Sequence, residues 1–246
     1  MEISNEPYRR EISDISAGRL WRWGKYAWHL FRSAPLRSMG LALLPIVSEA
    51  IVQLIPVAGV VLSKFSTPLM ASWVLAMVHN RASIGIFDPK YAGQLWLARL
   101  RQLLLLSLAS VGVFAFQLLA GLLIAGQDQT IALAAGNVAN LDLSRIQMAS
   151  ILVSGLVPAT LLAFASPLLL LSGHSVGYAM RESFFAVLRY WRPMLAYALV
   201  SAALLAGMLW QIWMLLLYLP IALFVGYAAY RDIFLGGPGH SADDDA

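Results

Sequence analysis

Residues 102–125 read QLLLLSLASVGVFAFQLLAGLLIA, a run that contains no charged side chain. A helix of about 20 apolar residues is long enough to cross the hydrocarbon core of a bilayer. A second uncharged run, residues 148–171, comes after a polar connection at residues 126–147. Two such runs joined by a short connection predict a transmembrane hairpin, with the connection on the side of the membrane opposite to the hairpin's two ends.

Two further hairpins are expected on either side of this one. The first spans about residues 36–78, and its tip is expected at Ile55–Gly59 because proline and glycine interrupt the apolar pattern there. The third spans about residues 193–230, with an uncharged tip around Trp210, Gln211 and Trp213. Tryptophan at a tip is typical of the interface between membrane and water.

The composition agrees with a membrane protein. The chain has 246 residues, of which 60% are hydrophobic and 12% charged, whereas soluble domains carry about 25% charged residues. The mean hydropathy is +0.72. We therefore predict an all-α polytopic membrane protein with six transmembrane helices in three hairpins, each preceded by a short interfacial amphipathic helix. Residues 17–235 form this single domain, residues 1–16 a flexible N-terminus, and residues 236–246 a flexible acidic tail.

The distribution of basic residues predicts the orientation. Of the 17 Lys and Arg residues, all but Lys64 and Arg145 lie before, between or after the predicted hairpins. Cytoplasmic segments of membrane proteins carry an excess of Lys and Arg. The sequence therefore predicts a multi-pass membrane protein with both termini in the cytoplasm.

The segment before the first hairpin, residues 19–32, reads RLWRWGKYAWHLFR. On a helix its apolar side chains, such as Trp23, Leu30 and Phe31, share one arc. A basic helix rich in Trp is typical of the membrane interface. This predicts a helix that lies on the cytoplasmic surface and binds anionic headgroups, with a partner protein as the alternative target. The candidate anionic-lipid contacts are Arg19, which lies at the margin of the apolar arc, and Arg22, Lys25 and Arg32.

Basic, aromatic segments also precede the other two hairpins. Asp88 and Pro89 are expected to cap a helix that ends near Arg101, and a helix is expected from Ser175 to Trp191. The three units are either an internal repeat or a shared requirement of chains that enter the membrane from the cytoplasm.

Glu49 and Lys64 are the candidate intramembrane ion pair. If the first hairpin turns near Pro56, both residues lie at the same depth on adjacent antiparallel helices. Ionisable residues within a membrane span suggest a functional site. The alternative is a structural ion pair near the outer surface, with the Lys64 side chain extended outward.

Several function classes find no support in the sequence. The chain has no cysteine, which excludes disulfides and Cys-based metal sites. It has no nucleotide-binding, nucleophile-elbow or zinc-protease motif, and the basic residues obey the membrane rule rather than a nucleic-acid pattern. His79 and His174 are expected at the interface rather than on a metal. We predict no catalytic, cofactor or metal site and no nucleic-acid partner.

Several short stretches resemble a family of uncharacterised proteobacterial six-helix integral inner-membrane proteins. They include the Trp21–Trp23 and Leu30–Arg32 stretches, the Ile55–Gly59 turn, the FFAVLRYWR stretch at residues 184–192 and the closing YRDIF at residues 230–234. The chain is more distantly similar to the membrane domain of bacterial glycerophosphodiester phosphodiesterases, whose catalytic domain has no counterpart here. The resemblance implies a six-helix architecture and a bacterial origin, with location in the inner membrane. It implies no particular activity.

Short loops and few polar residues within the spans indicate the expected function. They favour a non-enzymatic scaffold, assembly or lipid-organising factor. Its partners would be membrane lipids or another membrane protein. A transporter or channel for a small or lipidic substrate is the alternative, since translocation paths need polar or broken-helix sites near the middle of the membrane.

Overall fold

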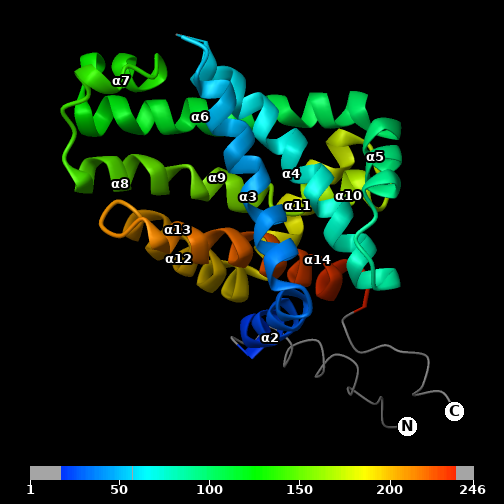
Figure 1. Ribbon diagram of the computed structural model, residues 1–246. Helices are drawn as coiled ribbons and strands as arrows, with labels where there is room; N and C mark the ends of the chain where they lie inside the picture. Colours follow the sequence, from blue (N-terminus) through cyan, green and yellow to red (C-terminus); the bar gives the residue numbers. More distant parts are fainter. Residues whose placement is uncertain (1–17, 57, 237–246) are drawn as a thin grey trace, which may run out of the picture.

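A computed structural model describes residues 18–56 and 58–236, and these residues contain helices and no strand (Figure 1). The two segments predicted to be flexible lie almost wholly outside the described residues. The helices up to the second predicted hairpin are α2 (Gly18–Arg32), α3 (Pro35–Gln53), α4 (Gly59–Ile84), α5 (Pro89–Ala98), α6 (Leu100–Ala125) and α7 (Gln127–Ala134). After the 3₁₀ turn η1 (Val138–Asn140), they are α8 (Arg145–Ser154), α9 (Leu156–Leu161), α10 (Ala165–Leu170), α11 (Val176–Arg189), α12 (Trp191–Gly207), α13 (Trp213–Pro220), the π-helix η2 (Ile221–Val225) and α14 (Gly226–Phe234).

Five helical segments of the described chain are long and apolar enough to cross a membrane. They are Pro35–Gln53, Gly59–Ile84, Leu100–Ala125, Arg145–Leu170 and Trp213–Phe234. The fifth expected span in chain order is a shorter apolar helix, α12, with 17 residues. At 1.5 Å per residue it reaches about 25 Å, just below the ~30 Å of hydrocarbon. By length and apolar composition, the described chain thus has five helical segments able to span a membrane and one borderline helix, which is compatible with a multi-pass membrane protein.

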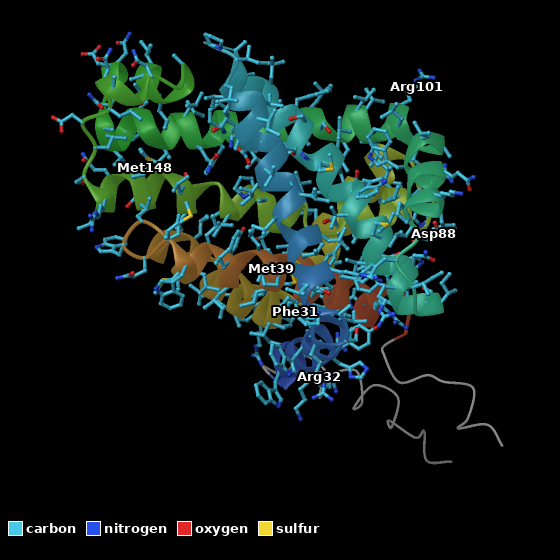
Figure 2. The ribbon with its side chains drawn as sticks, in the orientation of Figure 1. Phe31, Arg32, Met39, Asp88, Arg101 and Met148 are labelled. Carbon is cyan, nitrogen blue, oxygen red and sulfur yellow. The ribbon has the colours of Figure 1, made fainter. Side chains whose placement is uncertain are left out.

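Neighbouring spans along the chain contact each other in pairs: α3 with α4, α6 with α8, and α12 with α13. In Figure 1, α6, α8, α12 and α13 run in similar directions, while α3 and α4 cross them steeply. Figure 2 shows Arg101 and Met148 at opposite ends of the molecule, as expected for the starts of two antiparallel helices.

The expected turn and cap residues are confirmed. Pro35 is the first residue of α3, and the turn of the first hairpin lies between Gln53 and Gly59. A Cβ on Gly59 would lie 2.6 Å from the Val52 carbonyl oxygen, so only glycine fits this close approach. The Asp88 side chain caps α5 by accepting hydrogen bonds from the next helical N–H groups. The connection at residues 126–147 differs from a plain loop, because it contains α7 and η1.

The fourth expected span is interrupted. Residues 145–170 form three consecutive helices, and Pro158 and Pro167, which lack an N–H, lie within the second and third. At the second interruption, the buried Ser183 hydroxyl of α11 donates to the Leu161 carbonyl at 2.8 Å and accepts from the Phe164 N–H at 3.0 Å. Unpaired backbone groups are costly in a membrane, so this serine stabilises the break.

The most buried part of the protein lies where the second half of α4, α10 and α14 meet. Residues 74–78, most of α10 and residues 227–230 are buried there. The outer surfaces of the spans are apolar instead: Leu123 on α6, for example, is 87% exposed. Exposed apolar surface of this kind is expected where lipid tails, rather than water, surround the helices.

Candidate functional site

The N-terminal amphipathic helix α2 packs on the protein's own bundle. Its buried apolar side chains are Trp23, Ala27 and Leu30, and it contacts α12, η2, α14 and the start of α3. Phe31 makes an edge-to-face contact with Phe224, with ring centroids 6.0 Å apart. The centre of the apolar arc of α2 therefore contacts the rest of the protein.

A carboxylate near the C-terminal end of the bundle holds this helix. Asp232 of α14 accepts a hydrogen bond from the Trp23 indole N–H at 2.9 Å, and its same oxygen lies 3.2 Å from the Arg19 Nε. The Arg19 guanidinium also lies 4.7 Å above the centre of the Tyr190 ring. We call these four residues the Asp232 anchor. It joins α2 to both α14 and the junction between α11 and α12.

A second contact joins α2 to α14, one helical turn along α2 from Trp23. The Arg231 guanidinium donates to the Tyr26 hydroxyl and lies 5.3 Å from the centre of the Tyr26 ring. Arg231 and Asp232 are adjacent on α14, and both contact α2. The end of α14 therefore fixes how α2 is rotated about its axis.

That rotation sorts the four candidate lipid contacts into two groups. Arg19 is buried, with its side chain 8% exposed, and its charge faces Asp232. It is therefore withdrawn from the exposed surface of α2. Arg22, Lys25 and Arg32 are exposed, and Lys25 lies 5.5 Å from the Trp21 ring centre.

Two tryptophans share the exposed surface with these cations. Trp21 is 68% exposed and Trp28 is 62% exposed. We call the set Trp21, Arg22, Lys25, Trp28 and Arg32 the outer face of α2. Amphipathic Trp and Lys or Arg side chains are favoured at membrane interfaces, so this face has the composition of an interfacial surface although it is not the apolar arc of the helix.

Glu49 and Lys64 lie in contact across the first hairpin, with the Lys64 ammonium donating to Glu49 Oε1. Gln53 extends the cluster, because its Nε2 donates to Glu49 Oε1 at 3.1 Å and lies 3.2 Å from the Ser63 hydroxyl. Lys64 also lies 5.8 Å from the Phe114 ring centre. The Glu49 and Lys64 side chains are 20% and 29% exposed. The cluster forms a polar patch between α3 and α4 that α6 partly covers.

A small cavity of about 90 Å³ lies beside the break in the fourth expected span. It is lined by α4, α6 and the residues around the break, including Ser107, Ser110 and Ser166. At about 30 Å³ per water molecule it has room for roughly three waters. The neighbouring backbone groups at Leu161 and Phe164 are already hydrogen-bonded to Ser183. The lining is mainly apolar, and one of its three serines, Ser107, donates its hydroxyl hydrogen to the Leu103 carbonyl at 3.0 Å.

The histidines do not form a metal site within the described residues. In residues 18–56 and 58–236, no three His, Asp or Glu side chains gather closely enough to bind a metal ion. His79 Nδ1 lies 3.0 Å from the Tyr227 hydroxyl, and the His174 ring packs on Tyr178 with centroids 4.4 Å apart. Both histidines thus contact tyrosines near the ends of spans.

Three residues that hold the helices together here, Asp232, Tyr190 and Ser183, were not predicted from the sequence. The one available signal for Asp232 was a lone carboxylate at the end of a long apolar helix, where an unpaired charge is costly. Ser183 carried no signal, since a serine on an amphipathic helix is ordinary. Comparisons with protein-family models, with curated proteins and with solved structures found no match, so no relative assigns a role to the Asp232 anchor or to the outer face of α2.

Proposed function

We propose that this chain is a non-enzymatic multi-pass protein of the bacterial inner membrane that organises anionic lipids, as a scaffold or assembly factor. In this proposal all six apolar helices cross the membrane and both termini lie in the cytoplasm. The outer face of α2 contacts anionic headgroups at the cytoplasmic surface. The basic-residue bias and the resemblance to six-helix inner-membrane proteins support the location and topology.

One observation carries the lipid role. The Asp232 anchor turns the apolar arc of α2 into the bundle, and the same rotation leaves Lys25 and Arg32 exposed beside Trp21 and Trp28. A helix fixed in this way presents its cations in a constant direction. Each Lys or Arg near an anionic surface gains about 1 kcal/mol at most, and salt screens this attraction.

The lipid role is tested with the full chain in nanodiscs of phosphatidylcholine with or without phosphatidylglycerol. Mild extraction followed by mass spectrometry measures which lipid stays with the protein. Replacing Lys25 and Arg32 by Gln should lower the enrichment of phosphatidylglycerol by up to about 30-fold, because about 2 kcal/mol is lost. Arg145→Gln is the matched control and should change it little. Equal enrichment in all three proteins would refute the lipid role.

The topology is tested by labelling single cysteines, which is free of background because the chain has no native cysteine. Cysteines at Ser4 and Ser241 should react with an impermeant reagent only after the membrane is opened. A cysteine at Gln129, in the connection between the third and fourth expected spans, should react in intact spheroplasts. Labelling of either terminus from outside would overturn the proposed orientation.

A transporter is the second candidate, favoured by the interrupted span and the small cavity beside it. Broken helices near the middle of the membrane are typical of transporter substrate sites. Two features favour the scaffold instead: the cavity is small, and Ser183 already occupies the backbone groups exposed at one interruption. Alternating access predicts that a cysteine at Ser166 reacts with impermeant reagents from both sides of the membrane. A scaffold predicts no reaction from either side.

A further inference from the structure

A groove of about 620 Å³ lies between α2 and the third pair of helices, which is α12 and α13 together with η2. Its walls include Trp21, Trp28 and Phe31 of α2, together with Tyr197, Leu216 and Leu217 of the third pair. Met39 closes the end near the junction of α2 and α3. Phe31 and Met39 lie close to this junction in Figure 2, with Arg32 at the end of α2. We call this feature the α2 groove.

The α2 groove is apolar and elongated. Along α13 and η2 its lining extends from Leu216 to Val225, which corresponds to about 14 Å at 1.5 Å per residue. One leaflet of a ~30 Å hydrocarbon core is about 15 Å thick. Tyr197 is the only lining residue that carries a hydroxyl group, and this hydroxyl donates to the Ala222 carbonyl at 3.2 Å. The length and chemistry of the groove therefore match a single hydrocarbon chain rather than a polar solute.

The groove's wall on α2 also carries positive charge. Lys25 lies over the ring of Trp21, a lining residue, and the exposed Arg32 directly succeeds Phe31, another lining residue. No Asp or Glu is among the lining residues. A ligand with an apolar chain and an anionic end would match both features. Its chain would pack against the apolar lining residues, and its negative charge would lie beside Lys25 and Arg32.

The backbone beside the groove is irregular as well. The chain changes from α-helix to π-helix just after Pro220, and both Pro220 and Ile221 line the groove. Single-turn π segments inside helices are frequent at functional sites. Here the π segment places Phe224 against Phe31, so the shape of the groove depends on this local change.

We propose that the α2 groove binds one acyl chain of an anionic diacyl phospholipid whose headgroup pairs with Lys25 and Arg32. This rests on the proposed lipid role and adds a defined chain-binding site to it. The bound lipid bridges α2 and the third pair of helices.

The test uses the full chain purified in mild detergent and incubated with phosphatidylglycerol that carries a photoreactive diazirine near the end of one acyl chain. After illumination, cross-links should concentrate on peptides of α2 and of residues 213–225. Leu217→Trp, which fills the groove, should reduce this labelling about tenfold. The matched control is Leu123→Trp, which adds the same bulk at an exposed position on α6 and should leave the labelling unchanged.

The outcomes separate this site from the broader lipid role. If Leu217→Trp labels like the wild type, the groove site is wrong, while loss of phosphatidylglycerol enrichment in the Lys25 and Arg32 variants still supports the lipid role. If the wild type is labelled evenly over all spans, the site is also wrong. A change from dimer to monomer in Leu217→Trp would assign the groove to a second copy and overturn the proposal. If Leu217→Trp does not fold, Val200→Phe provides the same test at a lining residue of α12.

Discussion

Two ion pairs in this protein join helices in different ways. Glu49 and Lys64 are separated by 15 residues and connect two helices of one hairpin. The Asp232 anchor connects the first described helix to the last one, and its Trp23–Asp232 hydrogen bond spans 209 residues of sequence. The side chains of Glu49 and Lys64 are 20% and 29% exposed, whereas those of Arg19 and Asp232 are 8% and 11% exposed.

The difference shows which charges a hairpin alone can bring together. Once a hairpin turns near Pro56, residues at equal distances from the turn must lie side by side, so Glu49 and Lys64 were predictable as neighbours. No such relation connects Arg19 with Asp232. Their contact depends on how α2 packs against α12, η2 and α14 together, and the residue that stacks on Arg19, Tyr190, lies on yet another segment.

The largest effect is expected from Asp232→Asn. The change leaves the Arg19 guanidinium buried without its carboxylate, and breaking a buried ion pair costs about 3–5 kcal/mol. The free energy of unfolding, measured by denaturant titration in detergent, should fall by that amount. A cysteine placed at Ala27, a buried residue of α2 outside the anchor, should also react faster with thiol reagents when Asp232 is replaced by Asn.

The matched control for this prediction is Asp128→Asn, at an exposed acidic residue on α7. It removes the same charge without a buried partner and should change the free energy of unfolding by less than about 0.5 kcal/mol. Equal effects of the two substitutions would mean that the Asp232 anchor does not stabilise the fold.

A smaller effect is expected from Trp23→Phe, which keeps an aromatic ring but removes the indole N–H that Asp232 accepts. A hydrogen bond to a charged group contributes about 1.5–3 kcal/mol, so the free energy of unfolding should fall by about 2 kcal/mol. Trp21→Phe on the outer face of α2 is the control and should have almost no effect. If both substitutions cost the same, the hydrogen bond to Asp232 contributes nothing and only ring size matters.

The smallest effect is expected at the local pair. In a double-mutant cycle of Glu49→Gln and Lys64→Met, the double variant should be more stable than the sum of the two single changes implies. Contacting residues typically couple by about 0.5–3 kcal/mol, and partial exposure places this pair near 1 kcal/mol. Strictly additive changes in melting behaviour would show that the two charges do not stabilise each other.

Local features of the fold could be predicted from the sequence because a membrane restricts the backbone. Within hydrocarbon every N–H and C=O must be paired inside the chain, so long apolar runs become helices. Pro35, Asp88 and Gly59 then mark where helices begin or turn. The break in the fourth expected span was not anticipated, because its stability depends on Ser183 from a helix farther along the chain.

The sequence by itself determined that this protein is helical, which segments are apolar enough to span a membrane, and that α2 has one apolar and one basic side. Only the tertiary structure decided what covers each side. Lipid tails are as apolar as the interior of a helical bundle, so hydropathy cannot tell a surface that meets lipid from one that meets protein. The packing of α2 against the bundle determines which side is covered. Trp23 and Leu30 are buried, Arg19 pairs with Asp232, and Lys25 and Arg32 are exposed.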